Sequence, residues 1–228
     1  MADKKLSHKI LIRGILSYGF ILAITFISAG SLNYWQGWVY NGLNIFFVSF
    51  TYYVLSDNTE LIKERLKPGE GMKSWDKIYF LITSPFYFVM IILSAIDVGR
   101  LGWVPKLPLF GVIIGIVLYI IGQSIFLWSK KANRFFSTVV RIQKERDHKV
   151  CKGGPYRYVR HPGYVGGILY TFATPLVLGS FWGISINLFT VLPLIVRTYL
   201  EDKTLQKELD GYLEYTKEVK YSLIPKIW

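Results

Sequence analysis

Four long stretches of this chain contain no Asp, Glu, Lys or Arg, and they restrict the folds that the chain can adopt. These stretches are residues 14–56, 78–96, 107–129 and 162–196. A helix that crosses a bilayer needs about 20 mostly apolar residues, so the four stretches together can hold several such helices. Hydrophobic residues make up 52% of the chain, more than an ordinary soluble domain carries. We therefore predict an all-α, polytopic membrane protein.

We predict six membrane-spanning helices, followed by a cytoplasmic amphipathic helix. The ranges of the spans are 12–32, 36–56, 78–97, 108–129, 163–179 and 182–198. The stretch 162–196 would be about 52 Å long as one helix, which is too long for an ordinary crossing. Pro175 and the segment 179–183 (GSFWG) supply a break, so a hairpin of two short helices is expected there. We expect no cleavable signal peptide.

The distribution of cations predicts the orientation in the membrane. With the N-terminus in the cytoplasm, the six-span topology leaves only Arg100 and Lys106 outside, and the other 25 of the 27 Lys and Arg residues inside. Both termini are then cytoplasmic, and the segments 130–161 and 197–228 share one membrane face. Cytoplasmic loops account for the net charge of +12, so we expect no nucleic-acid partner. The short loops are compatible with a bacterial inner membrane, which we favour over the endoplasmic reticulum.

The segment after the last predicted span has the periodicity of an amphipathic helix. Its apolar positions, at spacings of three and four residues, are Leu205, Leu209, Tyr212, Thr216 and Val219. Arg197 and Glu201 precede them on the same face, so a guanidinium and a carboxylate point toward the packing surface. A buried ion is costly unless it is paired. The two residues therefore either form a structural pair at the end of a span or bind a ligand.

The segment 152–167, KGGPYRYVRHPGYVGG, is unusually polar and aromatic for its place between apolar stretches. Pro162 favours an extended conformation for His161 just before a span begins, and a plain interfacial anchor is one interpretation of this pair. The single cysteine excludes an internal disulfide, and no His or carboxylate pair has the spacing of a metal site. These residues alone predict a polar, cytoplasm-facing pocket built from 130–164 and 197–202, which suits an adenine-bearing ligand among others.

The same residues carry a likeness to a known family. In chain order the matching pieces are 133–137 (NRFFS), 148–151 (HKVC), 154–156 (GPY), 160–164 (RHPGY), Arg197, 201–202 (ED) and 211–225 (GYLEYTKEVKYSLIP). In this order they resemble the isoprenylcysteine carboxyl methyltransferase family and its relatives among phospholipid N-methyltransferases. The resemblance implies an integral membrane enzyme that binds S-adenosylmethionine (SAM) on the cytosolic side and takes a lipophilic acceptor from the bilayer. It divides the chain into a four-span region, 1–129, and a methyltransferase-like region, 130–228.

The resemblance also implies roles for individual residues. The implied cofactor-binding residues are His148, Lys149, Val150, Cys151, Tyr156, His161, Pro162, Gly163, Tyr164 and Glu201. Arg197 would hold the acceptor, with Asn133 also on the substrate side, and Arg197 and Glu201 would be the catalytic residues. Two positions depart from the family pattern: Arg141 stands where the eukaryotic enzymes have glutamine, and Asp202 where glutamate is common.

The implied chemistry agrees with the residues, although the acceptor stays open. Methyl transfer from a sulfonium is an in-line displacement, which depends on positioning and exclusion of water more than on acid–base catalysis. Arg197 suits a carboxylate acceptor, whereas an amine or a thiol would leave it without that role. Two other functions are considered: a sterol-reductase-like enzyme that uses NADPH, and a non-catalytic protein whose basic loops bind anionic lipid headgroups. Beyond membrane lipids and the acceptor, no obligate protein partner is indicated.

Overall fold

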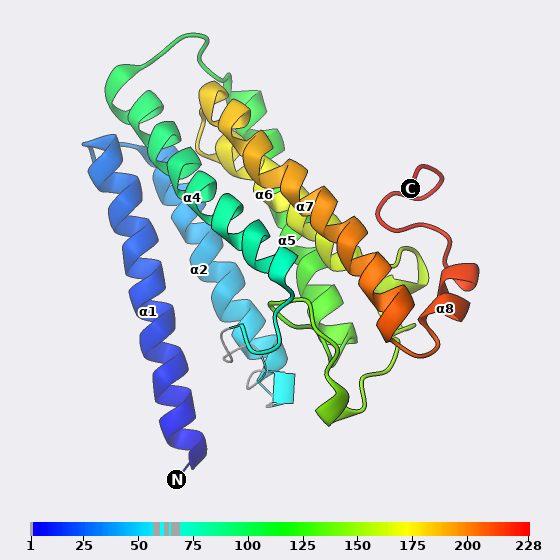
Figure 1. Ribbon diagram of the computed structural model, residues 1–228. Helices are drawn as coiled ribbons and strands as arrows, with labels where there is room; N and C mark the ends of the chain where they lie inside the picture. The colour runs from blue at the N-terminus through cyan, green and yellow to red at the C-terminus, as the bar shows by residue number, and fades with distance from the viewer. Residues whose placement is uncertain (1, 57–59, 62–63, 65–68) are drawn as a thin grey trace.

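The computed structural model describes residues 2–56, 60–61, 64 and 69–228; in the first helix it describes side chains from Leu16 onward. Every regular element in these residues is helical (Figure 1). The α-helices are α1 (Ala2–Ala29), α2 (Trp35–Leu55), α4 (Ser74–Ile96), α5 (Leu109–Ala132), α6 (Pro162–Val177), α7 (Phe181–Glu208) and α8 (Tyr212–Glu218). A π-helical turn, Asp97–Leu101, prolongs α4, and two 3-10 turns, Lys144–Arg146 and Gly154–Arg157, lie between α5 and α6. The prediction of an all-α fold is confirmed for the described residues.

Among the described residues, three helices are long and apolar enough to cross a membrane on their own. They are Ser74–Leu101, Leu109–Ala132 and Phe181–Glu208, with mean hydropathies of 2.0, 2.3 and 1.5, and Leu16–Ala29 is a shorter apolar helix. These helices support an integral membrane protein. The count of six spans and the cytoplasmic orientation stay predictions. Lys63, Arg65 and Lys67, which the orientation argument counts, lie outside the described residues, as do the side chains of the cations at 1–13.

The uncharged stretch 162–196 is divided between α6 and α7, with the break in the predicted place. Gly179 has a φ of +77°, which favours glycine, and the Ser180 hydroxyl accepts a hydrogen bond from the Gly183 N–H at 3.0 Å to start α7. The predicted span, 182–198, lies within a longer helix. The chain stays helical for 28 residues, through Arg197 and Glu201 to Glu208, so the turns that carry these two residues are continuous with the apolar part of α7.

The single amphipathic helix predicted for the tail is also wrong in its extent. Leu209 is extended and Gly211 has a φ of +78°, so the chain turns between α7 and the short α8. The turn changes which residues face inward, because Tyr215 is buried where the helical periodicity predicted Thr216. Leu209, Tyr212 and Tyr215 form a cluster against Ile142 and Val150, so the tail covers the segment between α5 and α6.

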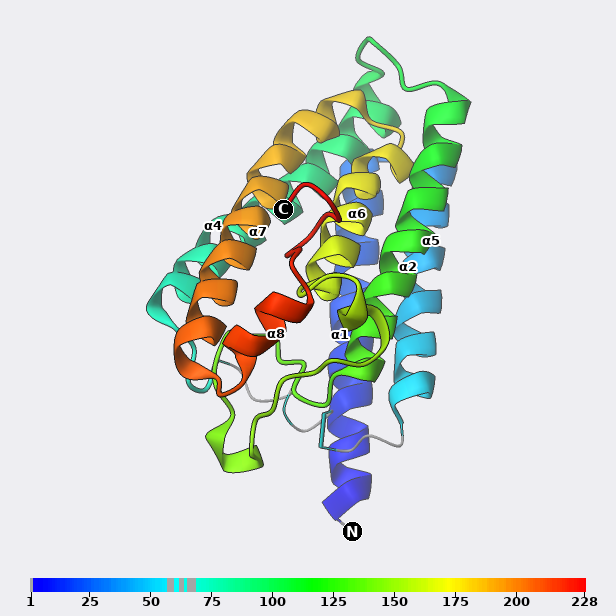
Figure 2. The same cartoon turned by 90° about the vertical axis from the view of Figure 1, so that its right-hand side faces the viewer.

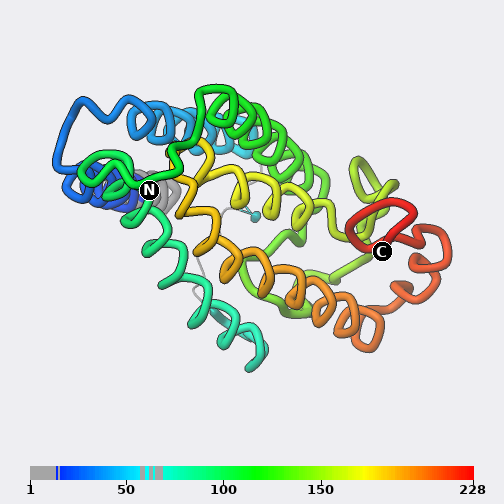
Figure 3. The backbone as a smooth tube through the Cα atoms, turned by 90° about the horizontal axis from the view of Figure 1, so that it is seen from above, coloured from blue at the N-terminus to red at the C-terminus, as the bar shows by residue number. Residues whose placement is uncertain are grey.

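The two ends of the bundle differ in structure. The α4–α5 connection lies at one end, and the end of α7, α8 and the segment 133–161 lie at the other, which is also the end that holds the N-terminus (Figures 1 and 2). Seen from above, α6 lies between α5 and α7, and α4 runs along α7 (Figure 3). The long α5–α6 connection thereby comes to lie against the ends of α4 and α7.

Helices α5 and α6 are in backbone contact at three glycines. A Cβ added to Gly122 would lie 2.5 Å from the Tyr170 nitrogen, and one added to Gly166 would lie 2.6 Å from the Gly122 carbonyl oxygen. Gly115 makes a similar approach to Leu176. Small residues are the common means of bringing membrane helices this close, since packing replaces the hydrophobic effect inside a bilayer. The contact fixes the start of α6 against the end of α5.

Replacing Gly166 by Ala is expected to lower the stability of the protein by about 1–3 kcal/mol, because the added methyl group meets backbone atoms that cannot move aside. Thermal unfolding in detergent, followed by tryptophan fluorescence, measures the change. The matched control is Gly42→Ala in α2, where an added Cβ has no neighbour within 4 Å. Equal melting temperatures for the two variants would contradict the close contact.

Candidate functional site

A cavity of about 540 Å³ lies at the end of the bundle that carries the α5–α6 connection. Its polar part is bounded by the segment 133–161, by the last turns of α7 and by α8. Its aromatic part extends between α4, α5, α6 and α7, where the lining includes Tyr79, Phe80, Phe88, Phe126 and Tyr170. One cavity thus joins a polar chamber to an aromatic arm within the bundle.

The structure brings almost all of the predicted site residues to this cavity. The predicted residues that line it are Asn133, His148, Lys149, Val150, Cys151, Tyr156, His161, Gly163, Tyr164, Arg197 and Glu201. Pro162 is the exception, because it occupies the first position of α6, where its ring starts the helix, and does not line the cavity. The positions are as predicted; the roles assigned to them stay predictions.

Glu201 presents a carboxylate to the cavity without a cationic partner among the described residues. Its oxygen accepts a short hydrogen bond from the Tyr164 hydroxyl, and none of the ion pairs in the described part of the chain includes it. The interpretation of Arg197 and Glu201 as a structural ion pair is therefore wrong. A half-buried carboxylate of this kind favours a positively charged ligand.

Arg197 is buried and held from the start of α4. Its Nε lies 2.8 Å from Asp76 Oδ1, and its Nη2 donates to the carbonyl oxygen of Thr138 at 2.9 Å. The rings of Tyr79 and Phe80 lie 4.6 and 4.9 Å from the guanidinium carbon, a spacing typical of cation–π contacts. Asp76 was not predicted as a site residue, because it lies 121 residues from its partner, in the first turn of α4.

Asp202 holds the polar chamber together and is the second residue that sequence reasoning missed as a site element. It accepts two hydrogen bonds from the guanidinium of Arg160, at 2.8 and 3.0 Å, and one from the Tyr212 hydroxyl at 2.9 Å. The His161 Nε2 lies 3.0 Å from the same carboxylate. Asp202 therefore holds the His161 ring through one nitrogen, and the ring forms part of the cavity wall.

The backbone of the tail closes the same corner. The N–H groups of Arg160 and His161 donate to the carbonyl oxygens of Tyr221 and Ser222 at 2.9 and 3.0 Å. The Arg160 guanidinium also donates to the carbonyl oxygens of Val219 and Lys220. The segment 219–222 is thus attached directly to the predicted contact motif at 160–164.

Three further polar residues of the chamber are neutral or paired. Burial and the nearby charges of Arg146 and Arg141 lower the pKa of His148 to about 4, so its imidazole is uncharged at neutral pH. Burial raises the pKa of the Cys151 thiol, which keeps it protonated. Arg141 is a cavity residue, but it forms a two-point ion pair with Glu64 at 3.0 and 2.8 Å. The chamber therefore offers uncharged hydrogen-bonding groups, the exposed cation Lys149 and the carboxylate of Glu201, which has no cationic partner in the described residues.

The fold and the site define an α-helical integral membrane protein with a cavity that joins a polar chamber to an aromatic arm. Residues 110–210 match the model of the phospholipid methyltransferase family. Because this match runs from α5 to the end of α7, it includes every predicted site residue. It begins 20 residues before the predicted boundary between the four-span and methyltransferase-like regions, which stays a prediction.

The chain is also similar to curated proteins named protein-S-isoprenylcysteine O-methyltransferase. The protein from Schizosaccharomyces pombe is 28% identical over 159 residues, 65% of this chain and 58% of the relative. The proteins from Saccharomyces cerevisiae and Homo sapiens are 31% identical over 110 residues and 28% over 122, and the matches cover 46% and 39% of them. Less than two thirds of each relative is thus matched. The chain is thus similar to proteins of the isoprenylcysteine carboxyl methyltransferase family, as its motifs predicted.

Proposed function

We propose that this protein is a membrane methyltransferase that transfers the methyl group of SAM to the carboxylate of an isoprenylated cysteine or a similar lipophilic acceptor. The observation that carries the proposal is the unpaired carboxylate of Glu201, which lies on α7 one turn from the buried Arg197, in a cavity that also has an aromatic arm. The relatives named protein-S-isoprenylcysteine O-methyltransferase support both the reaction and the class of acceptor.

The donor set of the polar chamber fits SAM better than NADPH. SAM carries a net positive charge, and Glu201 is a carboxylate that has no cationic partner in the described residues. A dinucleotide needs several cations for its phosphates, but the guanidinium groups of Arg141, Arg160 and Arg197 are each paired with a carboxylate. This leaves Lys149 as the cavity cation without an ion pair in the described residues. The neutral His148 and the hydroxyl of Tyr156 suit the hydrogen-bonding edges of adenine.

Bound SAM would supply a methyl group on a positively charged sulfur, whose transfer to a carboxylate oxygen breaks the carbon–sulfur bond and leaves a neutral thioether without moving a proton. Arg197 would orient the acceptor carboxylate with its free guanidinium edge. Tyr79, Phe80 and Phe88 would cover the apolar chain of the acceptor, and the covered site would exclude water. Positioning of two reactants is then the main contribution of the protein.

We also propose that the polar chamber faces the cytoplasm and that the acceptor reaches the aromatic arm from the lipid. The cations in 130–161 and 197–228 support this orientation through the positive-inside rule. A charged cofactor would then arrive from water at one part of the cavity, and a lipophilic acceptor from the membrane at the other. The two reactants would meet near Arg197 and Glu201.

The purified protein in lipid nanodiscs is expected to bind SAM in the micromolar range by calorimetric titration. It is also expected to transfer radiolabelled methyl groups to N-acetyl-S-farnesyl-L-cysteine as a base-labile ester, because an ester is the product of carboxylate methylation. Phosphatidylethanolamine vesicles and the methyl ester of the same prenylcysteine, which lacks a free carboxylate, serve as controls. Binding of NADPH without binding of SAM would contradict the proposal, and transfer to the phospholipid amine alone would contradict the acceptor.

A further inference from the structure

Asp76 is a buried residue of α4 that contacts residues of the cavity wall but does not itself line the cavity. Its side chain is 0% exposed, and it is absent from the cavity wall, whereas its two partners, Arg197 and Val140, both line that wall. A carboxylate in such a place costs several kcal/mol of desolvation unless it is fully paired. Its partners therefore determine what it does.

The hydrogen bonds of Asp76 connect the acceptor side of the cavity to the cofactor side. Oδ1 accepts from Arg197 Nε at 2.8 Å, and Oδ2 accepts from the backbone N–H of Val140 at 2.8 Å and from Arg197 Nη2 at 3.3 Å. Val140 belongs to the segment that follows α5, and Arg197 belongs to α7. One side chain thus fixes two walls that are 57 residues apart in sequence.

The ion pair also leaves Arg197 with one guanidinium edge available. Nε and Nη2 donate to Asp76 and to the Thr138 carbonyl oxygen, and Nη1 takes part in none of these bonds. The Tyr79 side chain also interacts with the guanidinium. Tyr79 and Phe80, which follow Asp76 on α4, flank the guanidinium plane. A two-point pair with a carboxylate holds the planar group in one orientation, so the direction of Nη1 is set from α4.

We propose that Asp76 is a positioning residue, which aims the free Nη1 of Arg197 at the acceptor carboxylate and keeps that arginine from pairing with Glu201. Glu201 lies one turn further along α7, and a free guanidinium would have that carboxylate within reach. By neutralising Arg197, Asp76 preserves the negative charge of Glu201 for the cofactor. This inference rests on the proposed function and adds to it a residue from the four-span region.

The test uses variants that keep the charges of residues 76 and 197 and change only the length or shape of the two side chains. Asp76→Glu moves the carboxylate by about one methylene, and a displacement of this size at a reacting group costs up to about 100-fold in rate. We expect kcat with N-acetyl-S-farnesyl-L-cysteine to fall at least tenfold, with the dissociation constant for SAM within twofold of the parent. In the Arg197→Lys background the same change should cost less than twofold, because the guanidinium that Asp76 positions is no longer present.

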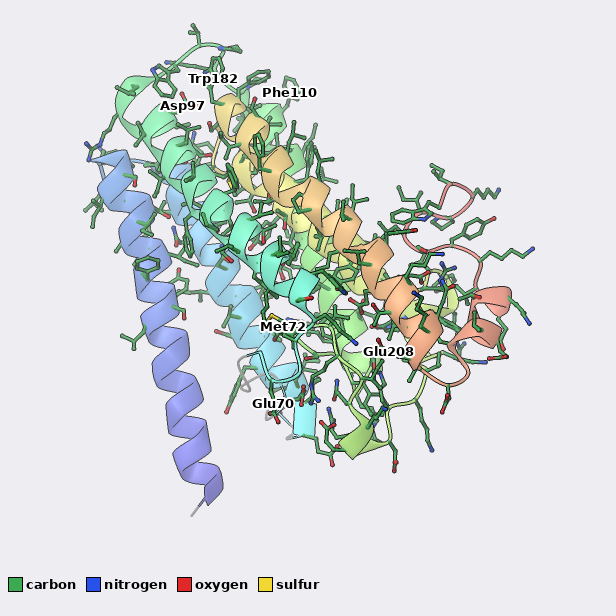
Figure 4. The ribbon with its side chains drawn as sticks, viewed as in Figure 1. Glu70, Met72, Asp97, Phe110, Trp182 and Glu208 are labelled. Carbon is green, nitrogen blue, oxygen red and sulfur yellow. The ribbon has the colours of Figure 1, made fainter. Side chains whose placement is uncertain are left out.

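The matched control is Asp97→Glu, which alters another buried carboxylate at the opposite end of the same helix (Figure 4). Asp97 accepts a hydrogen bond from Ser180 at 2.7 Å, far from the cavity, so its variant is expected to lose stability but keep the parent's kcat. The inference would be overturned if Asp76→Glu lowered kcat by the same factor in the parent and in Arg197→Lys, or if Asp97→Glu lowered kcat as much. Either result would leave the proposed function intact. A parent that binds neither SAM nor the prenylcysteine would overturn the proposed function, and the inference with it.

Discussion

Replacing Glu201 by Gln is expected to weaken SAM binding roughly 30- to 100-fold. The substitution keeps the shape and the hydrogen-bonding ability of the side chain but removes its charge, and a hydrogen bond to a charged group contributes about 1.5–3 kcal/mol. Because Glu201 is the cavity carboxylate that lacks a cationic partner among the described residues, its charge is available to a positive ligand. Calorimetric titration of SAM and S-adenosylhomocysteine measures the effect. The loss should be larger for SAM, since the product has lost the sulfonium charge.

The matched control for this prediction is Glu208→Gln, two turns further along α7. Glu208 forms an exposed ion pair with Lys73 at 2.7 Å, and such surface pairs contribute little to stability. We therefore expect parental SAM affinity in that variant. If Glu201→Gln bound SAM as tightly as the parent, the main support for a SAM site would be lost. A non-catalytic role in binding anionic lipids would then explain the structure better.

Replacing Arg197 by Lys is expected to lower kcat for the prenylcysteine about 100-fold while SAM affinity changes less than threefold. Lysine keeps the positive charge that Asp76 needs, so the buried carboxylate stays compensated and the protein stays folded. It cannot reproduce the planar two-point pair or the flat contacts with Tyr79 and Phe80. The acceptor carboxylate then loses the guanidinium edge that would orient it.

Single-turnover kinetics with saturating SAM separate this effect from slower product release. Folding of the variant is checked by its melting temperature in the same nanodiscs. A variant that kept the parental kcat would show that Arg197 is a structural residue, and the acceptor would have to be bound by another group. Equal losses of SAM affinity and kcat would instead assign Arg197 to the cofactor.

The sequence predicted the helices well because their signal is local. Uncharged stretches with Pro and Gly between them contain most of the information needed to place α2, α4, α5 and α6. The tail was harder, because its apolar spacing continues through the turn at Leu209–Gly211, where the extended Leu209 and the left-handed Gly211 interrupt the helix. Periodicity alone cannot detect such an interruption when the residues on both sides are buried by the same neighbours.

The sequence predicted several residues that line the candidate site, but not the ion pairs that hold the site together. Resemblance to a family identified 11 residues that line the cavity, whereas the carboxylates that pair with the arginines of the cavity, Asp76, Asp202 and Glu64, were not identified. Their partners lie 121, 42 and 77 residues away in the chain. Nothing in the spacing of an isolated acid reveals which distant cation it neutralises, so these pairs require the three-dimensional structure.

The attachment of residues 219–222 to Arg160 and His161 has a consequence for biosynthesis. The apolar helices can enter the membrane one after another as the ribosome makes them, but the N–H groups of Arg160 and His161 lack the backbone partners seen in the structure until Tyr221 and Ser222 have been synthesised. Asp202 and Tyr212, which bind the same corner, are also made late. The polar chamber is therefore completed only after the membrane helices have been translated, and a nascent chain stalled before residue 219 would hold an inserted bundle with an open site.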